Sequence, residues 1–213
     1  KEDFERVLVV EADRFQHLAY PKERLPGNGF QIEALAVLGE YNKDSAEPVN
    51  KLFEVLRDTA FDTHTYKHTT MGFLRDIERM PQMYDYSRTF FDRFYRPEYT
   101  TLVVAGDVHV DEVRAQVERH WGGWARGGYE CAVPVEPAPA GPREAHIEWA
   151  AHTLPYVMVA QRAPAYSDES VDGAALDLMG FLWFSESSPL YARLVIEEQC
   201  ADLLWASNAD HVD

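Results

Sequence analysis

Residues 31–42 have the sequence QIEALAVLGEYN, in which the apolar side chains recur at the three- and four-residue spacing of an amphipathic helix. We expect a helix from about Phe30 to Lys43. Glu33 and Glu40 are seven residues apart, so they lie within about 20° of each other on one stripe of this helix. A carboxylate among apolar neighbours is costly unless it is paired or binds a metal. The stripe is therefore a candidate metal site, although two glutamates on a solvated helix face fit the same spacing.

Segments with helical periodicity also lie on both sides of this stretch. They are residues 2–19, 48–59, 73–79, 82–95, 110–121, 171–184 and 189–199. Runs rich in β-branched and aromatic residues predict strands at residues 99–105, 145–151, 156–162 and 203–206. Because the helices cluster and the few strands do not alternate with them, we expect an α+β fold rather than a doubly wound α/β fold.

Residues 125–143 form the clearest boundary in the sequence. They contain Gly127, Gly128, Pro134, Pro137, Pro139, Gly141 and Pro142. A segment of this composition cannot sustain a helix or a central strand, so we interpret it as a linker. It separates residues 1–124 from residues 144–213, where the pattern of predicted elements starts again.

The composition is that of a globular chain and narrows the range of partners. The 213 residues are 46% hydrophobic, and 20 basic against 36 acidic side chains give a formal net charge of −16. An acidic surface repels phosphate, which argues against nucleic acid as a partner. No apolar run approaches the ~18 residues of a membrane-spanning helix. Cys131 and Cys200 allow one disulfide or none, which leaves the redox compartment open.

Other patterns point to chemistry less strongly. His64 and His68 have the i, i+4 spacing that can bind one zinc ion from a helix, which gives a structural zinc site as a further reading. The threonine-rich context favours an exposed loop instead. The sequence contains neither a glycine-rich phosphate loop nor a Gly-x-Ser-x-Gly motif. Taken alone, these residues leave the function undecided.

The order of several motifs is more informative than any one of them. After Glu33-x6-Glu40 come Ala60-Phe61-x-x-His64-x-Tyr66, Gly72-Phe73-x-x-Asp76-Ile77, Phe94-Tyr95-Arg96-Pro97-Glu98 and Leu102-Val103-Val104-Ala105-Gly106-Asp107-Val108. Beyond the linker come Leu154-Pro155-Tyr156, Arg162-Ala163-Pro164-Ala165-Tyr166 and Ser188-Pro189-Leu190-Tyr191-x-x-Leu194. In this order and spacing the chain resembles the pitrilysin/insulinase family of zinc peptidases, which includes the mitochondrial processing peptidases.

The resemblance implies a fold, an activity and a cofactor. Residues 1–124 are expected to be the C-terminal part of a processing-peptidase-like metallohydrolase domain, with an antiparallel sheet covered by helices, and residues 144–213 the start of a second, homologous domain. The implied activity is hydrolysis of peptide bonds by a zinc-activated water. Glu40 matches the glutamate that binds Zn²⁺ together with two histidines of a His-x-x-Glu-His motif. Glu33 matches an accompanying glutamate that orients a ligand or steadies the site through hydrogen bonds.

The chain departs from the family in one respect that bears on activity. No His-x-x-Glu-His occurs in the 213 residues, and the family carries this motif further upstream of Glu40 than the 39 residues present here. We therefore expect a fragment that is inactive alone, with its general base upstream. The implied partners are a peptide or small protein substrate and a second homologous domain or subunit.

An alternative is a non-catalytic homologue that serves as a scaffold or partner subunit of a peptidase complex. The presence of both Glu33 and Glu40 favours the peptidase, because an inactive site has no reason to keep carboxylates that we expect to be buried. The bacterial periplasm and the cytoplasm both fit the sequence.

Overall fold

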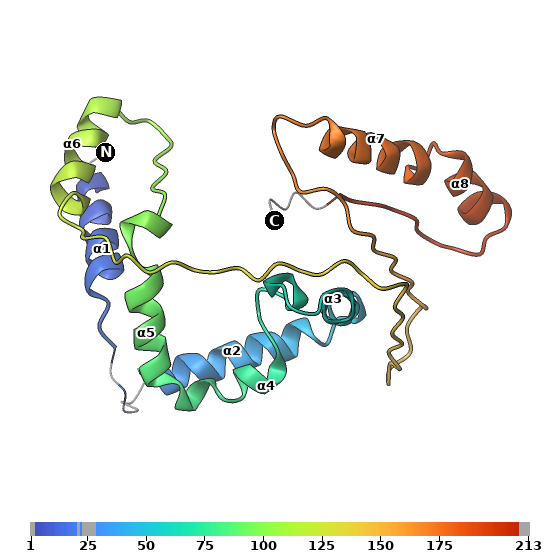
Figure 1. The fold of residues 1–213 in the computed structure, drawn as a ribbon, viewed down its shortest axis with the longest axis horizontal. Helices are drawn as coiled ribbons and strands as arrows, with labels where there is room; N and C mark the ends of the chain where they lie inside the picture. Colours follow the sequence, from blue (N-terminus) through green and yellow to red (C-terminus); the bar gives the residue numbers. More distant parts are fainter. Residues whose placement is uncertain (1–2, 21, 23–28, 209–213) are drawn as a thin grey trace. The chain divides into compact units, whose positions relative to one another are not determined.

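The computed structural model describes residues 3–20, 22 and 29–208. They form two compact units, Lys1–Met158 and Val159–Asp213, which Figure 1 colours in sequence order. None of the helices in the described part of the chain is long and apolar enough to cross a lipid bilayer.

The first unit is built from α-helices and short 3₁₀ turns. The α-helices are α1 (Phe4–His17), α2 (Phe30–Asp44), α3 (Pro48–Ala60), α4 (Leu74–Ile77), α5 (Tyr84–Phe94) and α6 (Val110–Trp121), and the 3₁₀ turns are η1 (Thr65–Lys67), η2 (Met80–Gln82) and η3 (Pro97–Tyr99). The predicted helices at residues 30–43 and 110–121 are confirmed to within one residue at each end. Proline at the first position of α3 suits a helix start, because its missing N–H has no partner there in any helix.

The second unit contains α7 (Asp172–Phe184), α8 (Pro189–Tyr191) and the π-helical turn η4 (Ala192–Glu197). The Ser188 hydroxyl accepts the backbone N–H of Tyr191 at 3.0 Å and so caps α8. Cys200 follows the π-helical turn as an exposed free thiol, and Cys131 of the first unit is likewise exposed and free.

The prediction of an α+β fold with an antiparallel sheet is wrong for the residues that the structure describes, which contain no β-strand. Residues 100–105, 145–149, 156–162 and 203–206 lie in irregular chain, without the ladder that a strand requires (Figure 1). Val103 and Val157 are 79% and 87% exposed, so no layer covers these segments. Side chains that suit a pleated surface do not make a strand unless another segment pairs with its backbone.

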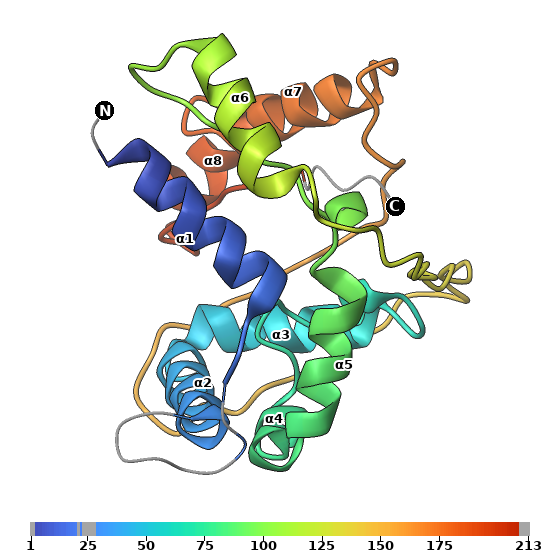
Figure 2. The same ribbon diagram turned by 90° about the vertical axis from the view of Figure 1, so that its left-hand side faces the viewer.

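Helices α1 and α6 lie side by side in both views of the chain (Figures 1 and 2). On α1, Leu8 and Ala12 are buried, and the ring of Phe15 lies 5.6 Å from that of Trp121 and 6.3 Å from that of Trp124. Aromatic side chains bury large apolar areas, so this cluster joins α1 to the end of α6.

Helix α2 packs against α4 and η2, while α3 packs against η1. The buried side chains at the α2 contact include Ala34 and Tyr41 of α2 and Ile77 of α4. This packing covers one side of α2 and leaves the side that carries Glu33 and Glu40 open to solvent.

Candidate functional site

The two glutamates of the predicted site both lie on α2, and both are exposed. Seven residues of helix place them about 10.5 Å apart along the helix axis. Gly39, next to Glu40, is exposed too, and a Cβ atom placed there would meet nothing within 4 Å. The carboxylates are therefore solvated in this structure rather than enclosed by the apolar neighbours that the sequence pattern indicated.

A polar network between helices holds α2 on α3. The hydroxyl of Tyr41, a residue only 4% exposed, donates to Glu54 Oε2 at 2.8 Å. The Lys51 ammonium donates to the Tyr41 hydroxyl at 3.2 Å and to Glu54 Oε1 at 2.6 Å. Because Tyr41 directly follows Glu40 in the helix, the network sets the rotation of α2 and with it the direction in which the glutamate stripe faces.

The ionisation of this network follows from its burial and its charges. Burial raises the pKa of Tyr41 above its usual 10.0, and the hydrogen bond to Glu54 raises it further. Burial lowers the pKa of Lys51, but the hydrogen bonds and charges of Glu54 and Tyr41 outweigh it, so the pKa of Lys51 lies above its usual 10.5. At neutral pH Tyr41 is thus a neutral phenol and Lys51 an ammonium, and hydrogen bonds that involve a charged group are the stronger kind.

His64 and His68 do not share a helical face, as a two-histidine zinc site would require. The residues between them form the 3₁₀ turn η1. His64 is 6% exposed, its Nδ1 accepts the backbone N–H of Tyr66 at 3.0 Å, and its ring lies 4.2 Å from that of Tyr66 and 6.0 Å from that of Phe61. His68 is exposed. The geometry therefore assigns His64 to the packing of this turn.

The described residues do not form a zinc site by themselves. A zinc ion holds its oxygen ligands at about 2.0–2.2 Å, whereas Glu33 and Glu40 are about 10.5 Å apart along the axis of α2. In the described part of the chain, no three His, Cys, Asp or Glu side chains come together as a metal-binding group. A zinc ion at Glu40 would need its other ligands from outside the described residues.

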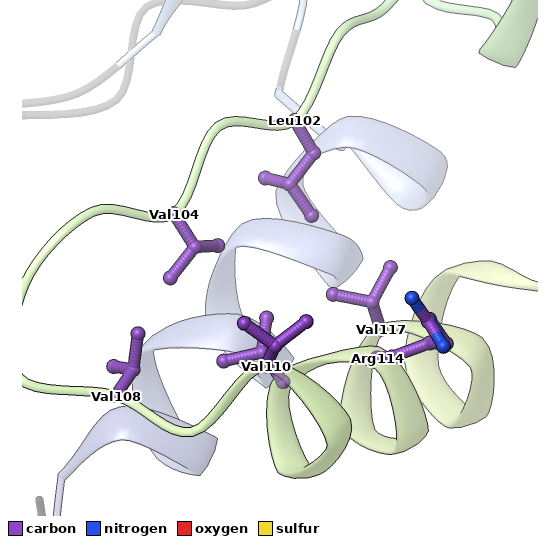
Figure 3. A pocket seen from close by; sticks show the side chains of 7 residues that line it. Leu102, Val104, Val108, Val110, Arg114 and Val117 are labelled. Atoms are coloured by element: carbon purple, nitrogen blue, oxygen red, sulfur yellow. The ribbon is translucent and has the colours of Figure 1, made fainter.

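An apolar hollow of about 270 Å³ lies between the chain before α6 and α6 itself. It is lined by Leu102, Val104, Val108, Val110, Val113, Arg114 and Val117. Figure 3 shows Leu102 and Val104 on the irregular chain facing Val110 and Val117 on the helix. Apart from Arg114, the lining side chains are aliphatic, so the hollow offers no side-chain ligand for a metal, and it includes none of the predicted site residues.

The network of Tyr41, Lys51 and Glu54 was not predicted from the sequence. Its one readable signal is the opposite charge of Lys51 and Glu54 at i, i+3 on α3, a spacing at which side chains meet on a helix surface. The third member comes from another helix, and helical periodicity alone does not indicate which neighbouring helix supplies it.

Comparisons with known proteins place this chain among proteins related to metallopeptidases. Residues 83–210 match the family described as "Peptidase M16 inactive domain". A curated relative, "Zinc protease PqqE" from Helicobacter pylori (strain ATCC 700392 / 26695), is 27% identical over 166 residues. That alignment covers 76% of this chain and 36% of the relative, so the chain spans about a third of the relative's length.

Since the family match extends over more than half of the sequence, the chain belongs to the peptidase M16 family. The resemblance to pitrilysin/insulinase-type peptidases is thereby confirmed.

Proposed function

We propose that this chain is part of a zinc-dependent metalloendopeptidase in which Glu40 donates one carboxylate ligand to the metal. Glu33 orients another ligand or steadies the site through a hydrogen bond. The observation that carries the proposal is the exposed pair of glutamates on one stripe of α2 in a chain of the M16 family. The relative named a zinc protease supports it, and a peptide or small protein is the proposed substrate.

The positions of the two glutamates account for their different roles. The exposed Glu40 carboxylate has free lone pairs, and the buried Tyr41 beside it fixes its direction. Glu33 is about two turns away, too far to bind the same ion, so it acts through a hydrogen bond to another ligand. When bound, zinc supplies a Lewis acid that lowers the pKa of a bound water. The histidine ligands and the general base belong to a His-x-x-Glu-His motif, which these 213 residues do not contain.

The domain organisation belongs to the same proposal. Residues 1–124 form the C-terminal part of the peptidase domain, residues 125–143 a linker, and residues 144–213 the beginning of a second, homologous domain. The family match at residues 83–210 includes the linker and most of the last segment. The partner of the first domain is then the second domain or a second subunit.

A second candidate function is a non-catalytic scaffold or partner subunit of a peptidase complex. One observation favours it: the matching family is described as an inactive domain.

Zinc binding by the full-length protein separates the two candidates. We would measure zinc content and affinity, by competition with a chelator, for the wild type and for Glu40→Gln, Glu33→Gln and Glu47→Gln. Glu47 is an exposed glutamate just before α3 whose side chain makes no capping hydrogen bond, so it serves as the matched control.

The peptidase proposal expects about one zinc per wild-type chain, much less in Glu40→Gln, and affinity weakened ~10–100-fold in Glu33→Gln, as for residues that support metal ligands elsewhere. Glu47→Gln should match the wild type. Equal zinc content in the wild type and Glu40→Gln would refute the role of Glu40, and absence of zinc from every variant would favour the scaffold.

A further inference from the structure

The loop that follows α3 binds the carboxylate of Glu136, which lies 72 residues or more along the chain. Glu136 accepts the backbone N–H groups of Asp62 at 2.6 Å, Thr63 at 2.8 Å and His64 at 2.7 Å. The hydroxyl of Thr63 is a further donor, at 3.0 Å. Successive backbone N–H groups that converge in this way form a concave anion site, and here the anion is a side chain of the same chain.

A second anchor lies seven residues further along, at Arg143. Its guanidinium donates to the carbonyl of Thr59 at 3.0 Å and to Asp62 Oδ1 at 2.9 Å, and it also donates to Asp62 Oδ2. The contact with Asp62 is thus bidentate, the geometry in which arginine and carboxylate pair best. Asp62 belongs to both anchors, since its N–H binds Glu136 and its carboxylate binds Arg143.

The electrostatics of the first anchor agree with its geometry. Partial burial raises the pKa of Glu136, but the hydrogen bonds from Asp62, His64 and Thr63 outweigh it and lower the pKa to about 2. The carboxylate is therefore ionised at any physiological pH, and the anion site stays filled.

We propose that Glu136 and Arg143 clasp the segment 125–143 onto the loop after α3, so that this segment is a fixed part of the first unit rather than a free linker. Figure 1 shows this segment in yellow as it runs past α3. Its glycines and prolines favour a free linker, yet two side chains fix it at separate points. The clasp goes beyond the proposed peptidase activity and does not depend on zinc.

The consequence of the clasp is a shorter reach for whatever follows it. A free chain of 19 residues has a root-mean-square end-to-end distance of about 24 Å and a maximum length of about 65 Å. Anchoring at residues 136 and 143 removes this freedom. Residues 125–143 then belong to the first unit, as does the chain up to Met158.

Hydrogen exchange of the full-length protein, followed by mass spectrometry at neutral pH, tests the clasp. The variants are Glu136→Ala, Glu136→Gln and Arg143→Ala. The control is Glu130→Ala, because Glu130 lies in the same segment, is exposed, and has no hydrogen bond or ion pair to the described residues. Limited proteolysis of the segment 125–143 provides a second readout.

In the wild type, the amides of residues 62–64 should be protected. In Glu136→Ala they should exchange at least ~10-fold faster, together with faster cleavage of residues 125–143. Arg143→Ala should loosen the same two regions to a smaller extent, and Glu130→Ala should not change them. If exchange in Glu136→Ala also becomes faster in α6, the whole unit has been destabilised, and the test then rests on faster exchange of residues 62–64 in Glu136→Gln and Arg143→Ala. Unprotected amides at 62–64 in the wild type, or variants indistinguishable from Glu130→Ala, would overturn the proposal.

Discussion

Removal of one hydroxyl group, in Tyr41→Phe, tests whether the polar network holds α2 on α3. The phenol donates to Glu54 at 2.8 Å and accepts from Lys51 at 3.2 Å, and Phe retains the ring while losing both hydrogen bonds. The substitution leaves the packing of the ring unchanged, so the expected effect belongs to the hydroxyl.

The size of the effect follows from the surroundings of the two partners. A hydrogen bond to a charged group contributes about 1.5–3 kcal/mol. Here Lys51 and Glu54 stay bonded to each other at 2.6 Å, with side chains 30% and 15% exposed, so water can replace part of what is lost. We therefore expect a loss of about 1–2 kcal/mol, which corresponds to exchange about 5- to 30-fold faster for amides in the C-terminal half of α2.

The assay is native-state hydrogen exchange on the full-length protein, with Tyr86→Phe as the matched control. Tyr86 is a 54% exposed residue of α5, and its hydroxyl makes no hydrogen bond to the described residues, so its removal should change exchange by less than a factor of about 2. Equal exchange in α2 for Tyr41→Phe and Tyr86→Phe would show that the network does not hold α2 in place.

Three further results are expected from the same contacts. The folded state raises the pKa values of Tyr41 and Lys51, so the stability that these groups contribute is complete below pH 10.0 and is lost as the pH rises through the raised values. In thermal unfolding between pH 8 and 11.5, the melting temperature of the wild type should therefore fall more steeply than that of Tyr41→Phe. The folded state lowers the pKa of Glu136 from 4.5 to about 2, so protection of the amides of residues 62–64 should persist at pH 5 and disappear as the pH falls towards 2. Loss of this protection already at pH 5 would contradict the clasp. Phe91→Ala should destabilise the first unit by about 3–5 kcal/mol in urea unfolding, because Phe91 is 6% exposed and its ring stacks on that of Tyr95 at 4.6 Å. Phe90→Ala, at a 45% exposed position, should cost less than half as much.

The helices could be predicted from the sequence because an α-helix satisfies its hydrogen bonds locally. The apolar period and the flanking Gly and Pro residues place α2, α3 and α6 within one or two residues of their observed ends. A β-strand, by contrast, makes its backbone hydrogen bonds to another segment of the chain. Residues 100–105 have the side chains of a strand, but strand formation needs a partner, and the sequence of one segment does not show whether a partner lies beside it.

The same distinction applies to the candidate site. The seven-residue spacing placed Glu33 and Glu40 on one stripe of a helix, because that relation depends only on helical geometry. Their exposure depends on which side of α2 packs against α4 and η2, and the apolar neighbours in the sequence indicated the opposite. The contact of Tyr41 with α3 joins two helices, and that of Glu136 with the 62–64 loop joins residues 72 or more apart, so helical periodicity alone did not indicate them.

Helix α3 connects the two features on which the proposals rest. Near its start, Lys51 and Glu54 hold Tyr41 and thereby the rotation of the helix that carries Glu40. Just beyond its end, Asp62 receives both anchors of the 125–143 segment. A 13-residue helix is about 20 Å long and bends little, so the position of Glu40 and the point at which the chain leaves Arg143 are fixed to one rigid body.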